Sequence, residues 1–172
     1  MKKVNKYFLI ICSLLFIISA QAKSKALSIG SPDAKVVIKV FSSLTCPHCA
    51  NFHTAVYDKL KEEYIDNGLV RFEHHPFPLD LAALNAEIIV RCHIDNQKNF
   101  QLLGEIYKKQ NKWAMGSDIN VINESIKKIG LDSGLDNDKM DTCLKNENTQ
   151  DQILNERIEA QKKYKIQSTP TI

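Results

Sequence analysis

A Cys-x-x-Cys motif between an apolar segment and an amphipathic one constrains the fold of this chain more than any other feature. The motif is Cys46-Pro47-His48-Cys49, and residues 36–41 before it are rich in β-branched and aromatic side chains. Such a segment is typical of a strand buried in the middle of a sheet. Pro47 suits the first position of a helix, where a missing N–H costs nothing, so Cys46 is predicted to be the N-cap. The sequence therefore places two cysteines at a strand-to-helix turn.

The two cysteines are expected to differ in reactivity. Backbone N–H groups of His48 and Cys49 would point at the Cys46 sulfur, close to the positive end of the helix dipole, so Cys46 is predicted to be an exposed, acidic nucleophile. Cys49 begins a face that would pack against the sheet and shield its thiol. That face comprises Cys49, Phe52, Val56, Leu60 and Tyr64. A reactive thiol beside a protected one is the arrangement that thiol–disulfide exchange requires.

The same motif also occurs in zinc sites and in inert local disulfides, and both are alternatives. A zinc site would need further ligands, yet Cys92 and Cys143 stand alone in the sequence, and His74-His75 lack the usual ligand spacing. We therefore predict no metal. The strand-to-helix context of the motif favours redox chemistry over both alternatives.

Residues 1–22 have the pattern of a secretory signal peptide. A lysine-containing start precedes an apolar run over residues 7–20, and Ala20-Gln21-Ala22 fits a small-x-small cleavage site. The apolar run is short for a membrane span, and an uncleaved anchor is the alternative. We expect the exported chain to begin near residue 23.

Charge excludes nucleic-acid binding as the expected function. The chain has 23 Lys and Arg against 20 Asp and Glu, and three of the lysines lie in the predicted signal peptide. Removing that segment leaves a formal net charge of zero, which gives no electrostatic basis for binding nucleic acid. Four cysteines would remain, an even set in an exported protein, where disulfides persist.

The exported chain is long enough for a single domain, and its pattern divides that domain into three parts. Residues 23–78 read as the first α/β part, and its second strand over residues 69–75 places His74 and His75 at a strand edge near the surface. Residues 79–148 repeat apolar side chains at helical spacing and are predicted to form an α-helical subdomain. Residues 149–172 return to the first part through a long helix. The buried stripe of that helix is predicted to be Ile153, Leu154, Ile158 and Tyr164.

Cys92 and Cys143 fall on apolar faces of two different predicted helices. Export favours a structural disulfide between them, and two buried reduced thiols are the alternative. A bond between them would close a loop of about 50 residues and stabilise the fold by roughly 3 to 4 kcal/mol through the unfolded state.

Three segments of the chain resemble DsbA-type thiol oxidases of the thioredoxin-like superfamily. They are Thr45-Cys-Pro-His-Cys after its strand, the Arg71-x-Phe to Phe-Pro-Leu79 passage, and Ser168-Thr-Pro-Thr-Ile172. The resemblance implies an α/β thioredoxin-like fold with an inserted α-helical subdomain. It also implies a cis peptide bond before Pro170, which would turn the backbone of Thr169 toward the Cys46 sulfur to pair with an extended substrate.

The resemblance also implies a function. It indicates a periplasmic thiol:disulfide oxidoreductase that introduces disulfides into exported proteins with reduced cysteines, using the Cys46–Cys49 pair and no cofactor. Pro47 and His48 would tune its oxidising strength, and a protonated His48 would stabilise the Cys46 thiolate. A quinone-linked membrane oxidase of the DsbB type would reoxidise the pair, so the membrane is contacted only through this partner. The alternatives are a disulfide isomerase or reductase of the same fold, and a copper-chaperone-like module that binds metal through Cys46, Cys49 and a histidine.

The sequence departs from the family pattern in two places. It stops at Ile172 inside an expected strand, so the C-terminal strand or strands and the last helix of the fold are predicted to be missing. Related enzymes often place a buried acid six residues before the first cysteine, but Val40 occupies that position here, next to Lys39. The pattern therefore does not identify the residue that assists proton transfer at Cys49.

Overall fold

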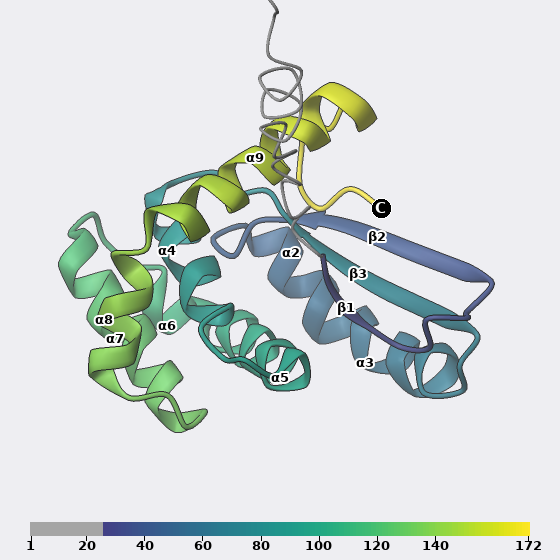
Figure 1. The fold of residues 1–172 in the computed structure, drawn as a ribbon, viewed down its shortest axis with the longest axis horizontal. Helices are drawn as coiled ribbons and strands as arrows, with labels where there is room; N and C mark the ends of the chain where they lie inside the picture. Colours follow the sequence, from purple (N-terminus) through teal and green to yellow (C-terminus); the bar gives the residue numbers. More distant parts are fainter. Residues whose placement is uncertain (1–25) are drawn as a thin grey trace, which may run out of the picture.

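The computed structural model describes residues 26–172, so the predicted signal peptide at residues 1–22 lies outside the described residues. A small mixed sheet lies on one side of the molecule and a cluster of helices on the other (Figure 1). The elements are β1 (Leu27–Ile29), β2 (Val36–Ser42), α2 (Pro47–Phe52), η2 (His53–Tyr57), α3 (Asp58–Leu60), η3 (Lys61–Ile65), β3 (Val70–Pro76), α4 (Leu81–Val90), α5 (Asn96–Lys108), α6 (Gln110–Trp113), α7 (Ile119–Asp132), α8 (Asn137–Leu144) and α9 (Glu147–Tyr164). The predicted thioredoxin-like α/β fold with inserted helices is confirmed.

The strand order in the sheet is β1-β3-β2, with β1 antiparallel and β2 parallel to β3. The prediction that residues 36–41 lie in the middle of the sheet is wrong for the described residues, because β3 is the central strand. On the other side of β2, the backbone pairing within the described residues is an antiparallel bridge between Phe41 and Thr171. Val36, at the far end of β2, is accordingly 52% exposed, whereas Phe41 beside the bridge is buried.

The helical segment that follows the motif reaches Ile65, as predicted, but its buried face differs from the predicted one. Val56 and Tyr64 are exposed. The buried residues of the segment are instead Cys49, His53, Tyr57 and Ile65. Two π-helical stretches, η2 and η3, interrupt the α-helix here. A π-helical turn contains more residues than an α-helical turn, so it shifts the buried face away from the positions that a strict α-helical periodicity predicts.

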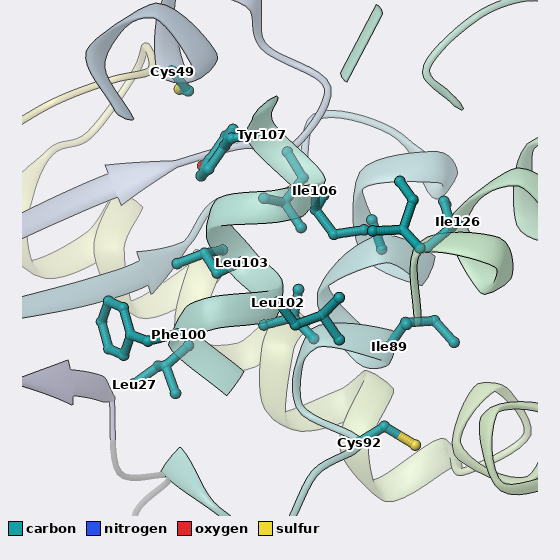
Figure 2. Close-up of a cluster of buried hydrophobic side chains, with 14 of the residues drawn as sticks. Leu27, Cys49, Ile89, Cys92, Phe100, Leu102, Leu103, Ile106, Tyr107 and Ile126 are labelled. Atoms are coloured by element: carbon teal, nitrogen blue, oxygen red, sulfur yellow. The ribbon is translucent and has the colours of Figure 1, made fainter. Parts of the chain in front are cut away.

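The inserted helices α4 to α8 share one core with the sheet. Side chains from α4, α5 and α7 fill its centre, including Ile89, Leu102, Leu103, Ile106 and Ile126, all at most 1% exposed. Figure 2 shows this cluster with Cys92 at one end and Cys49 beside Tyr107 at the other. The helical insertion is therefore packed directly against the helix that carries the motif.

Cys92 and Cys143 are joined by a disulfide, which confirms the predicted pair. The bond joins Cys92, which follows α4, to Cys143 in α8, with a Cα–Cα distance of 6.1 Å and a sequence separation of 51 residues. A loop of that length corresponds to a stabilisation of roughly 3 to 4 kcal/mol through the unfolded state. The disulfide therefore helps to hold α8 against the rest of the insertion.

Helix α9 packs through a narrower stripe than the sequence predicts. Ile153 and Ala160 are buried, whereas Leu154, Ile158 and Tyr164 are exposed. Polar contacts replace apolar burial along part of the helix, since Arg157 donates to the Pro78 carbonyl over 2.7 Å. Between residues 26 and 172, no helix combines the length and the apolar character needed to cross a bilayer.

Candidate active site

Cys46 is the N-cap of α2, and Pro47 occupies the first turn, as the sequence predicts. The prediction of an exposed Cys46 side chain is wrong, because this residue is only 7% exposed. Pro47 and His48 form the exposed part of the motif. The chain near the C-terminus covers the sulfur, and the Cys46 thiol donates to the Thr169 carbonyl over 3.4 Å.

Thr169 and Pro170 lie opposite Cys46, and the peptide bond between them is cis. Both features agree with the implication of the family resemblance. Thr171, two residues beyond Thr169, exchanges backbone hydrogen bonds with Phe41, with N–O distances of 2.8 and 3.1 Å. This bridge fixes the cis-proline loop to the end of the strand that leads into the motif. Residues 123 positions apart in sequence thus form one site.

The two thiols have opposite pKa shifts. Burial would raise the pKa of Cys46, but interactions with the Thr169 side chain, with Cys49 and with the His48 backbone outweigh it and lower this pKa. Burial raises the pKa of Cys49 to about 12, and the neighbouring Cys46 sulfur adds to the increase. A thiolate therefore forms at Cys46 in preference to Cys49, which is the asymmetry predicted from the motif.

Side chains from the insertion hold the loop that carries Cys46. The Gln110 amide donates to the Leu44 and Cys46 carbonyls over 2.7 and 3.0 Å. Thr45 donates to Asp80 over 2.7 Å, and Asp80 also caps α4 by accepting from the Ala83 N–H. The sequence analysis predicted neither the contacts of Gln110 nor those of Asp80. Asp80 before an apolar helix was a recognisable N-cap signal, whereas nothing in the sequence around Gln110 indicated its partners.

His53 lies one turn beyond Cys49 and was also missed by the sequence analysis. Its ring stacks between Tyr57 and Tyr107, with centroid distances of 4.4 and 4.9 Å, and the residue is 7% exposed. Burial, and to a smaller extent repulsion from His74, lowers the pKa of His53 to about 4. A neutral imidazole therefore lies beneath the motif at neutral pH.

The burial of His53 predicts a pH-dependent stability. Between about pH 4 and 6.5 the unfolded chain protonates this residue and the folded chain does not, so stability falls as pH falls through that window. The difference corresponds to roughly 3 kcal/mol. His53→Phe is expected to remove this part of the pH dependence, as measured by denaturant unfolding of both proteins at pH 7 and pH 4. Parallel curves for the two proteins would contradict the assignment.

His74 belongs to a buried ionic cluster, so its predicted place near the surface is wrong. His74 and Glu87 are each 2% exposed, and their side chains are 2.9 Å apart. Glu87 also accepts from Arg91 over 3.0 Å, and Arg91 donates to Glu156 over 2.8 Å. His74 is buried because β3 is the central strand, paired on both sides. His75 is half-buried and lies 3.0 Å from the Glu73 carboxylate.

In the part of the chain that the structure describes, no three His, Cys, Asp or Glu side chains are grouped as metal ligands would be. Cys46 and Cys49 are free thiols here.

A strand-to-helix Cys-x-x-Cys opposite a cis-proline, on a mixed sheet with inserted helices, defines a thioredoxin-like protein. Residues 22–172 match the family described as Thioredoxin, and the chain belongs to that family. Among solved structures, alpha-DsbA1 of Wolbachia pipientis is similar with a TM-score of 0.79 and 28% identity over 86% of this chain and 73% of that one. The resemblance to DsbA proteins is thus confirmed.

Two curated relatives carry names that describe related chemistry. Disulfide bond formation protein D of Bacillus subtilis (strain 168) is 27% identical over 153 residues, which are 84% of this chain and 65% of that protein. A Rickettsia bellii (strain RML369-C) relative, whose name describes an unproven protein-disulfide oxidoreductase, is 31% identical over 67% of this chain. The chain spans only 44% of that relative's length, and about half or less of the similar Rickettsia proteins.

Proposed function

We propose that this protein is a DsbA-type thiol:disulfide oxidoreductase that oxidises cysteine pairs in exported proteins. The observation that carries the proposal is the Cys46 sulfur, which lies at a helix N-terminus, 3.4 Å from the Thr169 carbonyl before a cis-proline. Its pKa is lowered, whereas the pKa of Cys49 behind it is raised. This arrangement suits attack at one sulfur and protection of the other.

The reaction starts from the Cys46–Cys49 disulfide. A substrate thiolate attacks the Cys46 sulfur, the Cys46–Cys49 bond breaks, and its electron pair stays on Cys49. The second substrate thiolate then attacks the substrate sulfur of the mixed disulfide, and Cys46 leaves as a thiolate. Because its lowered pKa makes Cys46 a good leaving group and stabilises the reduced protein, the pair favours oxidation of the substrate. The chemistry needs no cofactor beyond the two cysteines.

Substrate binding is expected along the cis-proline loop. Thr171 already pairs with Phe41 as a strand would, and the Thr169 main chain next to it faces Cys46. An extended substrate segment can add to this backbone by strand pairing. His48 is exposed, and its position between the two cysteines supports a role in tuning the oxidising strength of the pair.

The pattern of residues 1–22 supports export to the periplasm as the setting. There, reduced cysteines of exported proteins would be the substrates. A quinone-linked membrane oxidase of the DsbB type would restore the Cys46–Cys49 disulfide.

The test uses the oxidised protein and a fluorescent peptide with two cysteines. We expect the peptide disulfide to form at the same rate as the Cys46–Cys49 bond is lost. Both reactions are measured by quenching samples with an alkylating reagent and analysing them by mass spectrometry. Equilibration with glutathione then measures the oxidising strength. Faster recovery of a scrambled disulfide protein than oxidation of the peptide would instead indicate an isomerase. Stoichiometric copper after gel filtration, without peptide oxidation, would support the metal-binding alternative.

A further inference from the structure

The Tyr107 hydroxyl is a buried polar group that the mechanism above does not use. Tyr107 lies near the end of α5 and is 3% exposed. Within residues 26–172 its hydroxyl makes no hydrogen bond of normal geometry, and the Ser42 side chain interacts with it closely enough to lower the pKa of Tyr107. A buried hydroxyl without a partner destabilises a fold, so its presence calls for an explanation outside packing.

Three observations place Tyr107 in the part of the core that contains Cys49. The Tyr107 ring stacks on His53, which follows Cys49 by one turn of the same helical segment. Cys49 and Tyr107 lie together at one end of the core (Figure 2). Burial is the largest cause of the raised pKa of Tyr107, and negative charge on Cys49 is the next, ahead of charge on Glu87 and on Cys46.

We propose that Tyr107 donates a hydrogen bond to the Cys49 sulfur while that sulfur carries negative charge. The inference rests on the proposed function, in which Cys49 receives the electron pair when a thiolate attacks Cys46. The new bond forms between the attacking sulfur and Cys46, and the Cys46–Cys49 bond breaks. Cys49 then takes a proton from solvent, and Tyr107 keeps its own.

His53 and Glu87, two other titratable groups near Cys49 and Tyr107, do not donate a hydrogen bond to the Cys49 sulfur. His53 is neutral, since its pKa is lowered to about 4. Glu87 is committed to His74 and Arg91. The Ser43 backbone and the Thr169 side chain reach Cys49 as well and lower its pKa. Tyr107 adds a donor from α5, the helix of the insertion that packs against the motif helix.

The test compares Tyr107→Phe with Tyr57→Phe. Both tyrosines stack on His53, but the Tyr57 hydroxyl is influenced by Asp58 and Asp66 rather than by the sulfurs. Single-turnover reduction of the Cys46–Cys49 disulfide by dithiothreitol is followed at pH 6, 7 and 8. Tyr107→Phe is expected to slow it by about tenfold at each pH, because a hydrogen bond to a charged group contributes on that order. Tyr57→Phe is expected to match the wild type.

Two further measurements separate this role from a structural one. The unfolding midpoint of Tyr107→Phe is expected to equal or exceed that of the wild type, because the variant loses an unpaired buried hydroxyl. Its equilibrium with glutathione at pH 7 is expected to stay within about twofold, because Cys49 is a neutral thiol in the reduced protein. A reduction rate within twofold of the wild type, or slowing only with lost stability, would overturn the inference. Since the probe is a small dithiol, this result does not depend on oxidation of exported proteins.

Discussion

Glu87→Ala is expected to lower the free energy of unfolding by roughly 3–5 kcal/mol, as loss of one partner from a buried ionic cluster does. Glu87 is 2% exposed and contacts His74 and Arg91 at 2.9 and 3.0 Å. The substitution removes a carboxylate partner of Arg91, of which only 13% of the side chain is exposed and which keeps its contact with Glu156. It also leaves the buried His74 ring without its acidic partner, and it opens space between β3 and α4.

The same cluster predicts how the stability of the fold changes in acid. Burial would raise the pKa of Glu87, but His74 and Arg91 outweigh it and lower this pKa to about 2, from 4.5 in an unfolded chain. A lowered carboxyl pKa adds stability that is fully present above pH 4.5 and is lost as pH falls toward 2. Glu87→Gln keeps the shape of the side chain without its charge, so its stability is expected to vary less than that of the wild type across this window.

Denaturant unfolding at pH 7 and at pH 3 measures both effects. A matched control is Glu124→Ala, which removes a carboxylate that contacts Lys127 but has 65% of its side chain exposed. That change is expected to cost less than about 1 kcal/mol. If Glu87→Ala were as mild as this control, the cluster would not hold β3, α4 and α9 together as the contacts indicate.

The features that the sequence predicted correctly are those set by neighbouring residues. Pro47 after Cys46 determines the helix start. Burial would raise the pKa of Cys46, but the Thr169 side chain and the N–H groups at the helix start outweigh it, so this pKa is lowered as expected. The Thr169-Pro170 segment was placed opposite Cys46 by family resemblance, and the cis bond and the 3.4 Å contact agree with it. The disulfide between Cys92 and Cys143 was anticipated because two apolar helical faces each carried one cysteine.

The features that the sequence analysis missed depend on contacts between residues far apart in the sequence. The parallel register sets Val40 of β2 opposite His74 of β3, and the His74 side chain contacts Glu87 of α4. Nothing local to His74 indicates that Glu87 lies against it. The π-helical turns that put His53 into the core likewise reflect packing against α5, where Tyr107 stacks on its ring.

Cys46→Ser is expected to reduce peptide oxidation to the uncatalysed background, because a serine hydroxyl cannot form the disulfide that the cycle transfers. Cys49→Ser retains the reactive sulfur and loses only the protected one. Its Cys46 thiolate is expected to attack one sulfur of an added peptide disulfide, which breaks that bond and releases the other sulfur as a thiolate, so a mixed disulfide between Cys46 and the peptide accumulates. Removing the other pair, Cys92→Ala with Cys143→Ala, is the control, since that disulfide lies at the far end of the core from Cys49 (Figure 2).

This control is expected to oxidise the peptide normally at 10 °C while unfolding more readily, by roughly 3 to 4 kcal/mol. Peptide oxidation and trapped adducts are both read by mass spectrometry after alkylation. The three variants therefore separate loss of chemistry from loss of stability. Undiminished oxidation by Cys46→Ser would show that the reacting sulfur lies elsewhere, and adducts at Cys49 in place of Cys46 would reverse the roles that their pKa shifts assign.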